Sequence, residues 1–290
     1  MIDDVSMALS GYSMRQDTMT HLVNAISATD LQITLANVQN VGQGVLEIED
    51  ELVYVTAVNQ AASVVTVAPW GRGYAGTTAV AHDANVRVTA TPTFPRQKVA
   101  NAINDTLLAT SGSLFAVGSF SFTYTPAVTT YELPAEVDGV FHVSYEEIGP
   151  SKEWITIRRY EYDRMADTSK FPSGKTLTLM QHVQPGRTIR VTFSKDPSKL
   201  TTGSMEFTAT GLPASCEDVM KLGAQYRLLS NIEPGRLSLT SPEADYNSNR
   251  ITFGSGTNTA KYVYALFQQR LAEESNSLKG KYHNRIHFKR

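Results

Sequence analysis

The sequence lacks the features that mark secreted, membrane-spanning or cysteine-rich metal proteins. Cys216 is the one cysteine, which excludes an internal disulfide framework and a cysteine-rich zinc site, and we expect it to be a small buried side chain. No apolar run approaches the roughly 18 residues of a membrane span. The first residues, Met-Ile-Asp-Asp, have neither the cationic start nor the apolar run of a secretion signal. We therefore expect a soluble protein, made in a cytoplasm, with no membrane partner.

Motifs of catalysis and cofactor binding are missing as well. The six histidines show no metal-ligand spacing, and the pair His283 and His287, four residues apart, has no third ligand in view. Gly174-Lys175-Thr176 ends like a phosphate-binding loop, but Ser169 occupies the position that needs glycine, and the residues that follow have a strand pattern. There is no Gly-x-Ser-x-Gly elbow. The sequence therefore predicts no cofactor, no metal site and no enzymatic activity.

A short acidic stretch could suggest a calcium site or a catalytic carboxylate pair. It contains Glu47, Glu49, Asp50 and Glu51. The stretch straddles an expected strand–turn–strand corner, and alternating acids are normal on the exposed face of an edge strand. We interpret the cluster as such a solvated face.

The bulk composition is that of an ordinary globular protein. Apolar residues make up 41% of the chain and charged residues 19%, with a formal net charge of −2. Overall charge thus gives no reason to expect nucleic-acid binding. A chain of 290 residues can form one large domain or about two to three small ones, each with a core.

Four parts follow one another along the chain: an N-terminal arm, a small β-module, a larger domain and a basic C-terminal tail. They cover residues 1–29, 30–92, 93–278 and 279–290. The larger domain is expected to contain a helix over 95–109, a β-insertion over 113–210, and helices over 212–231 and 257–278. The expected fold class is α+β, with a small antiparallel β-module followed by a helical bundle that carries an inserted β-region.

The first two parts differ in their apolar pattern. In the arm, Met19, Leu22, Val23 and Ile26 form one weak helical stripe, so we expect a docking arm or a short packed helix. From residue 30, short β-branched and apolar runs alternate with Gly, Asn and Asp turns. The runs cover residues 32–35, 44–48, 52–58, 64–67 and 86–89. They predict a compact antiparallel barrel or sandwich.

Three helices are predicted from apolar residues at helical spacing. The expected stripes are Val99, Ile103 and Leu107 in the first, Val219, Leu222, Tyr226 and Leu229 in the second, and Val263, Phe267, Leu271 and Leu278 in the third. Gly223 and Ala224 in the second helix would let another backbone come close. Within the β-insertion, apolar and polar residues alternate over 120–124 and 189–193, which is the period of half-buried strands.

The most distinctive stretch is residues 70–82, Trp-Gly-Arg-Gly-Tyr-Ala-Gly-Thr-Thr-Ala-Val-Ala-His. Its glycines permit tight turns, Arg72 can pair locally, and Tyr74 and His82 can pack or hydrogen-bond within a loop. Together with the acidic corner before it, this string resembles a small β-module that recurs in virion proteins of tailed bacteriophages. The resemblance implies a structural virion protein in which Trp70, Arg72 and Tyr74 contact another subunit or the tail.

The order of the later elements resembles a head-to-tail connector, or neck adaptor, of a tailed bacteriophage. The resemblance covers residues 94–290 and includes the helix with Lys221-Leu222-Gly223-Ala224-Gln225-Tyr226-Arg227-Leu228-Leu229 and the helix with Gln269-Arg270-Leu271-Ala272-Glu273-Glu274. It implies a dodecameric ring of this chain in the virion neck. Such a ring joins the portal protein of the DNA-filled head to a downstream tail or neck protein. The residues before 94 exceed the minimal pattern of the family.

The C-terminal tail has aromatic and histidine residues between its cations. The resemblance implies that this tail docks into the portal through Lys279, Lys281, Tyr282, Arg285, Ile286, Phe288, Lys289 and Arg290. The alternative is that it lines the DNA channel through phosphate contacts. We favour docking to protein, because Tyr282, Ile286 and Phe288 offer apolar anchors that phosphate binding does not need.

Two other functions remain open from the sequence. A minor tail or baseplate protein would use the β-module to bind a tail subunit or a host glycan, with Trp70 and Tyr74 as stacking platforms. An enzyme such as a cell-wall hydrolase would need paired acids or a metal site. The C-terminal tail favours the connector, because an adaptor needs such a segment and a receptor-binding module does not.

Overall fold

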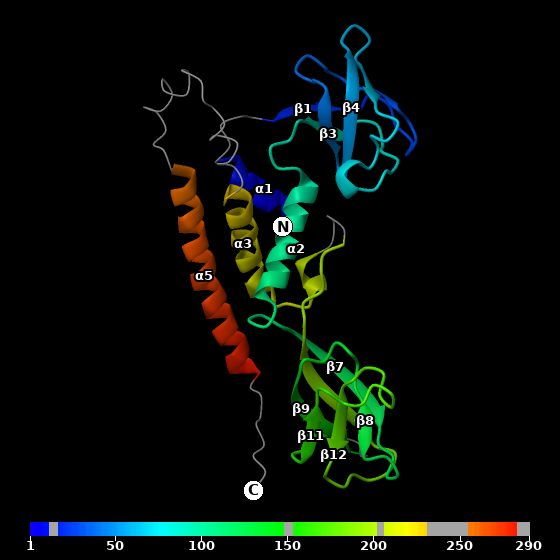
Figure 1. Cartoon of the computed structure of the whole chain (residues 1–290), viewed down its shortest axis with the longest axis vertical. Helices are drawn as coiled ribbons and strands as arrows, with labels where there is room; N and C mark the ends of the chain where they lie inside the picture. Colours follow the sequence, from blue (N-terminus) through cyan, green and yellow to red (C-terminus); the bar gives the residue numbers. More distant parts are fainter. Residues whose placement is uncertain (12–16, 148–152, 202–205, 231–254, 283–290) are drawn as a thin grey trace. The chain divides into compact units, whose positions relative to one another are not determined.

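The computed structural model describes residues 1–11, 17–147, 153–201, 206–230 and 255–282 (Figure 1). The chain divides into two compact units. The first comprises Met1–Thr106, Leu200–Glu206 and Asp218–Phe267. The second comprises Leu107–Lys199, Phe207–Glu217 and Gln268–Arg290. Each unit is thus built from separate stretches of sequence. Among the described residues, no helix is both long enough and apolar enough to cross a membrane.

The first unit contains a β-module of six antiparallel strands, blue to cyan in Figure 1. The strands are β1 (Thr18–His21), β2 (Gln32–Thr34), β3 (Gly44–Ile48), β4 (Glu51–Asn59), β5 (Val64–Val67) and β6 (Arg87–Ala90). They pair in the order β1-β6-β3-β4-β5-β2. The two edges meet where Leu22 bridges Leu35, and the Val23 N–H donates to the Thr34 carbonyl there. The module is therefore barrel-like.

Aliphatic side chains fill the interior of this module. Leu46 and Ile48 of β3 are buried, as are Val53 and Val55 of β4, because alternate residues of a strand point to the same face. The five strand runs predicted over 32–89 each coincide with a strand to within about two residues. Those strand predictions are confirmed, since period-two alternation is a direct consequence of strand geometry.

The N-terminal residues differ from their prediction. They form α1 (Ile2–Ser10), and the chain then enters strand β1. The helical stripe predicted from Met19, Leu22, Val23 and Ile26 is wrong, because Met19 lies in β1 with 63% of its surface exposed, while Leu22 is fully buried in the module. Burial along β1 alternates with a period of two, which four scattered apolar residues in a polar stretch do not reveal.

Helices lie at all three predicted places: α2 (Arg96–Thr110), α3 (Glu217–Ser230) and α5 (Ser255–Lys281). The predicted stripe of α2 is buried, and so are Val263, Phe267 and Leu278 of α5, whereas Leu271 of the same predicted stripe is only half-buried. Two 3-10 turns, η2 (Phe207–Thr210) and η3 (Ala214–Cys216), precede α3, so this helix begins later than predicted. Cys216 is fully buried in η3, as expected.

The buried face of α3 is rotated from the one predicted. It consists of Val219, Met220, Gly223, Ala224, Leu228 and Leu229. Leu222 and Tyr226 are only half-buried, so the predicted stripe is wrong at these two positions. The reason is Gly223, whose missing side chain lets α3 approach Thr106 of α2 and Phe267 of α5 closely. The close approach was predicted from Gly223, but its effect on which face is buried was not.

The second unit is a β-sandwich, drawn mostly in green in Figure 1. Its strands are β7 (Ala116–Thr123), β8 (Thr130–Glu132), β9 (Gly139–Glu146), β10 (Trp154–Thr156), β11 (Tyr160–Asp163), β12 (Thr176–Leu179) and β13 (Thr188–Lys195). One antiparallel sheet has the order β10-β9-β13-β7 and the other the order β11-β12-β8. A shared core that includes Leu133, Leu177 and Val191 gives this unit an interior of its own.

The predicted fold class, a helical bundle carrying an inserted β-region, is wrong. The described residues form three antiparallel sheets of six, four and three strands and four α-helices, so the protein is mostly β-sheet. The β-region over 113–210 does not rely on a helical bundle to bury its apolar residues, because its two sheets pack against each other and share one core. Helical periodicity stands out over the 15 residues of α2, whereas strands of 3 residues such as β8 and β10 give little signal.

Candidate functional site

A buried ion-pair network lies beneath the distinctive glycine-rich stretch. Glu51, the first residue of β4, accepts hydrogen bonds on both carboxylate oxygens. Its Oε1 accepts from Arg72 Nε at 2.7 Å and Gly73 N at 2.9 Å, and its Oε2 accepts from Arg72 Nη2 at 3.0 Å and Val80 N at 3.2 Å. His82 Nε2 donates to the same Oε2 at 2.9 Å. The side chains of Glu51 and His82 are fully buried, and that of Arg72 is 6% exposed.

Arg72 links three separate segments of the β-module. Beyond Glu51, its Nη1 donates to the Ser27 carbonyl at 2.6 Å and to the Asp30 carbonyl at 3.1 Å. Its Nη2 also donates to the Val80 carbonyl at 2.7 Å. All three guanidinium nitrogens of Arg72 therefore donate hydrogen bonds within the β-module. Arg72 stabilises the module, and little of its side chain remains accessible to an outside partner.

The electrostatics of the network favour its charged form. Burial would raise the pKa of the Glu51 carboxyl, but hydrogen bonds from His82, Arg72 and the backbone of Gly73 and Val80 outweigh burial and lower the pKa to about 2. Burial would lower the pKa of His82, but its contacts with Glu51 and Glu49 raise it above the ordinary 6.5. Below that raised pKa, two cations face two carboxylates.

The β-module should lose stability as the pH rises through the raised pKa of His82. Such a group contributes stability in full below its unfolded pKa of 6.5, and this contribution is lost above the folded value. We expect the Tm to decline from about pH 6.5 upward. The variant His82→Asn should have a lower Tm at about pH 6 and a flatter profile, as measured by circular dichroism from about pH 5 to 9. An equally steep decline in the variant would contradict this assignment.

The acidic stretch is not the solvated face that the sequence suggested. Glu51 is 1% exposed and Glu47 is 8% exposed, so the interpretation is wrong for both. Burial raises the pKa of Glu47, which accepts a hydrogen bond from the backbone N–H of Arg96. Asp50 is exposed and pairs with Arg96 Nε at 2.9 Å. Among the described residues, no group of three or more His, Cys, Asp or Glu could hold a metal ion.

Three aromatic side chains meet on the surface of the module, and we call Tyr54, Trp70 and Tyr74 the aromatic platform. The rings of Tyr54 and Trp70 stack with centroids 5.0 Å apart and planes at 28°. Tyr74 lies 5.2 Å from Tyr54 and 6.0 Å from Trp70. Trp70 is 63% exposed. Such a cluster presents apolar area with little conformational freedom, which suits it to contact a partner.

Two glycines fix the loop that carries this platform. A Cβ on Gly71 would lie 2.6 Å from the carbonyl oxygen of Tyr54, whose N–H donates to the Gly71 carbonyl at 2.8 Å. Gly73 has φ +62°, a left-handed conformation, and a Cβ there would lie 2.9 Å from the Thr77 carbonyl. The glycines thus hold Trp70 and Tyr74 against β4.

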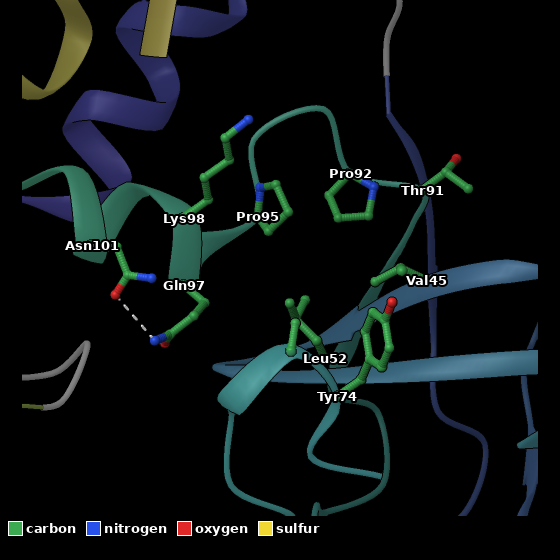
Figure 2. A pocket seen from close by; sticks show the side chains of 10 residues that line it. Val45, Leu52, Tyr74, Thr91, Pro92, Pro95, Gln97, Lys98 and Asn101 are labelled. Carbon is green, nitrogen blue, oxygen red and sulfur yellow. Dashed lines mark hydrogen bonds between the residues drawn. The ribbon is translucent and has the colours of Figure 1, made fainter. Parts of the chain in front are cut away.

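Tyr74 also forms one wall of an open pocket of about 490 Å³ (Figure 2). The apolar wall is made by Val45, Leu52, Pro92 and Pro95, and the polar rim by Gln97, Lys98 and Asn101. Figure 2 shows Gln97 and Asn101 joined on α2, where Nε2 of Gln97 donates to Oδ1 of Asn101 at 3.3 Å. No carboxylate or imidazole is among the described lining residues. The pocket can therefore hold an apolar group, and its ionisable lining groups are the Lys98 amine and the Tyr74 hydroxyl.

The chain was compared with models of known protein families and with curated proteins. No family model and no curated protein matches it.

Of the three residues predicted to contact a subunit or the tail, two are placed together at the surface. Trp70 and Tyr74 belong to the aromatic platform, whereas Arg72 lies beneath them in the ion-pair network. Sequence reasoning assigned Glu51 to a solvated face, which is wrong, and missed Tyr54. The sequence did contain a signal for Glu51. Arg72 and His82 are the cationic residues of the otherwise neutral stretch 70–82, and buried cations need carboxylates nearby.

Three of the predicted portal-docking residues lie within the described chain. Lys279 and Lys281 are exposed on the last turn of α5. Tyr282 is 36% exposed, and its ring centroid lies 5.5 Å from that of Phe141 and 6.4 Å from that of Phe115. The others, Arg285, Ile286, Phe288, Lys289 and Arg290, lie outside the described residues, as do His283 and His287.

Proposed function

We propose that this chain is a structural virion protein of a tailed bacteriophage that forms a ring and joins the portal of the head to the tail. The observation that carries the proposal is the arrangement of the stretch that resembles phage virion modules. Its charged residues Arg72 and His82 are buried with Glu51, and Trp70 is left 63% exposed on a rigid loop. The buried ion pairs thus hold the loop in place while the Trp70 ring stays accessible to a partner, which supports an assembly role.

The chemistry of the described residues supports contact with a partner more than reaction with a substrate. The side chains of Glu51 and His82 are fully buried, so a substrate has no access to these two groups. The pocket beside Tyr74 is accessible, but its ionisable lining groups are one lysine and one tyrosine. An exposed aromatic cluster next to an apolar pocket is typical of an anchoring site in a protein interface.

A closed ring requires two different surfaces on each copy, because a head-to-tail contact closes by rotation. The aromatic platform supplies one exposed apolar surface. A second is available on α5, where Tyr262 is 64% exposed and Tyr264 is 42% exposed. Tyr264 packs against Tyr226 of α3, with ring centroids 4.7 Å apart, so this contact fixes the position of the Tyr264 ring.

The basic end of the chain is proposed to dock into the portal. Lys279 and Lys281 lie on the exposed last turn of α5, directly before residues 283–290. Tyr282 packs against Phe115 and Phe141 within its own unit, so it would anchor the start of the docking segment. Contact with DNA in the channel is the alternative for these cations, and it would make docking strongly dependent on salt.

Two variants test this function in particles assembled when the chain is supplied from a plasmid to a phage that lacks it. One ends at Tyr282, which keeps the packing against Phe141, and the other is Trp70→Ala. Each should stay folded and reduce infectious particles at least about tenfold, with unjoined heads visible by electron microscopy. Met165→Ala, at a position 93% exposed in the second unit, is the matched control and should have no effect. A full titre from both variants would contradict the connector role.

The aromatic platform also favours a second candidate, a minor tail or baseplate protein that binds a tail subunit or a host glycan. Trp70 offers a flat, exposed ring on which a sugar could stack, and the apolar pocket begins at the neighbouring Tyr74. The same variant separates the two functions. If Trp70→Ala leaves heads joined to tails but prevents adsorption to cells, the second candidate replaces the first.

A further inference from the structure

Strand β7 is an open edge of the β-sandwich. It pairs with β13 over its whole length, and no described strand pairs with its other side. Ser119, Ser121 and Thr123 are exposed, and Phe120 and Phe122 are half-buried. No charged residue occurs anywhere in residues 106–131. The edge is therefore long, neutral and free of proline within the strand, which is the type of edge that recruits another strand.

The ladder geometry identifies the backbone groups that face outward. Tyr124 N–H donates to the Arg187 carbonyl on β13 at 2.8 Å, so even-numbered residues of β7 bond to β13 and odd-numbered ones face away. At Thr125 the outward groups are satisfied, because the Tyr131 hydroxyl accepts from its N–H at 2.9 Å and donates to its carbonyl at 3.0 Å. No such cap is present at Ser119 or Ser121 among the described contacts.

The other edges of the sandwich are protected in ways that β7 is not. Strands β8 and β10 have only 3 residues each. Strand β11 has Glu161 and Asp163 within its 4 residues, and charges on an edge oppose strand addition. Strand β7 has 8 residues and neither defence. A partner edge of matching length and neutrality exists in this molecule only as β7 itself, among the described strands.

We propose that two copies of this chain associate through β7, edge to edge, about a two-fold axis at Phe120. About that axis Ser119 mirrors Ser121 and the β-branched Val117 mirrors the β-branched Thr123, whereas Gly118 lies opposite Phe122. An antiparallel pairing in this register sets Ser119 opposite Ser121 of the second copy. Because the backbone N–H and carbonyl groups of both residues point away from β13, each such pair exchanges two backbone hydrogen bonds.

This dimer is separate from the ring contact and does not depend on the proposed function. A two-fold contact uses the same patch on both copies and closes on two, whereas a ring needs two different patches. The pairing covers the open edge of the free chain and shields Phe120 and Phe122 further from water. The failure of one proposal thus leaves the other intact.

The first test is the mass of the full-length chain by sedimentation equilibrium. Wild type should sediment as a dimer of the 31.8 kDa chain at about 50 µM. Ser121→Pro should raise the dimer dissociation constant at least about tenfold, because proline removes an outward N–H that β13 does not use. Ser121→Thr retains that N–H and is the matched control. Circular dichroism checks that the proline variant is folded.

The second test fixes the register and does not depend on the proline variant. Ser119→Cys combined with Ser121→Cys places cysteines opposite each other, with Cα atoms about 5.5 Å apart, which lies within the range that a disulfide spans, so oxidation should link the two copies. Ser119→Cys alone leaves its nearest partner cysteine about 7–8 Å away, which is too far for a disulfide. Cys216 is fully buried and can stay.

Each result of the two tests either supports the β7 dimer or overturns it. Dimeric wild type, dissociation by Ser121→Pro and cross-linking of the double variant alone support the proposal. A dimer that survives Ser121→Pro, or cross-links equally through Ser119→Cys alone, would overturn it, since another surface or register would hold the copies. A monomeric wild type with no cross-linking would also overturn it and leave the β7 edge to a strand from a different protein.

Discussion

Replacing Glu51 with Gln should lower the free energy of unfolding of the β-module by about 3–5 kcal/mol. The variant would leave the Arg72 guanidinium, 6% exposed, without its counter-charge, and would remove the charged acceptor that His82 Nε2 uses. Breaking a buried pair from one side costs this much because the remaining charge has lost both its water and its partner. An effect of this size is a large fraction of the stability of a typical domain.

The matched control for this prediction is Glu49→Gln. The Glu49 side chain is 58% exposed and, among the described residues, contacts the network through His82 Nδ1 at 2.8 Å, so its replacement should cost less than about 1 kcal/mol. Urea unfolding followed by tryptophan fluorescence measures both variants. Trp70 belongs to the first unit and Trp154 to the second, so a Trp154→Phe background makes the signal specific for the module. Equal losses from both variants would show that Glu51 is not the centre of the network.

The second large effect is expected at Gly223, where adding one methyl group should destabilise the first unit. A Cβ there would overlap Thr106 Cγ2 and lie 3.0 Å from Phe267 Cε2, which is tighter than ordinary packing. Overpacking of this kind costs about 1–3 kcal/mol, which more than offsets the gain of about 1 kcal/mol that alanine brings to a helix. We therefore expect Gly223→Ala to lower the free energy of unfolding.

The sign of this effect can be checked against a second helical glycine. At Gly280 in α5 an added Cβ would have no neighbouring atom within 4 Å, so Gly280→Ala should stabilise the protein slightly. Thr106→Ser removes the overlapping methyl but keeps the hydroxyl that donates to the Ala102 carbonyl at 2.8 Å. Combined with Gly223→Ala, it should restore part of the lost stability in a double-mutant cycle. If Gly223→Ala stabilises the protein as Gly280→Ala does, the close approach of α3 is wrong.

The sequence was a good guide to strands β2 to β6 of the β-module, because each of them leaves a local pattern, whereas β1 does not. In β3 and β4, the buried Leu46, Ile48, Val53 and Val55 recur at every second position of their strands, and the glycine-rich turns between strands have recognisable composition. The aromatic platform could be predicted in part, since Trp70 and Tyr74 stand out in an otherwise small-residue string. Tyr54 could not, because its place beside them depends on pairing across the sheet.

The parts that could not be predicted depend on long-range contacts. Glu49, Asp50 and Glu51 are equivalent in sequence, yet only Glu51 is fully buried, because the tight turn before β4 directs it toward Arg72, 21 residues away. The fold class failed for a related reason. The helices α2, α3 and α5 were found correctly, but nothing local shows that the strands from β7 to β13 bury one another as a sandwich.

The proposed ring between head and tail is tested most directly by counting and locating this chain in purified particles. Quantitative mass spectrometry gives the number of copies per particle, and a symmetry-resolved electron-microscopy image of the neck gives their position. We expect about twelve copies in one ring directly below the portal. A few copies confined to the distal end of the tail, or absence from the particle, would contradict the proposal.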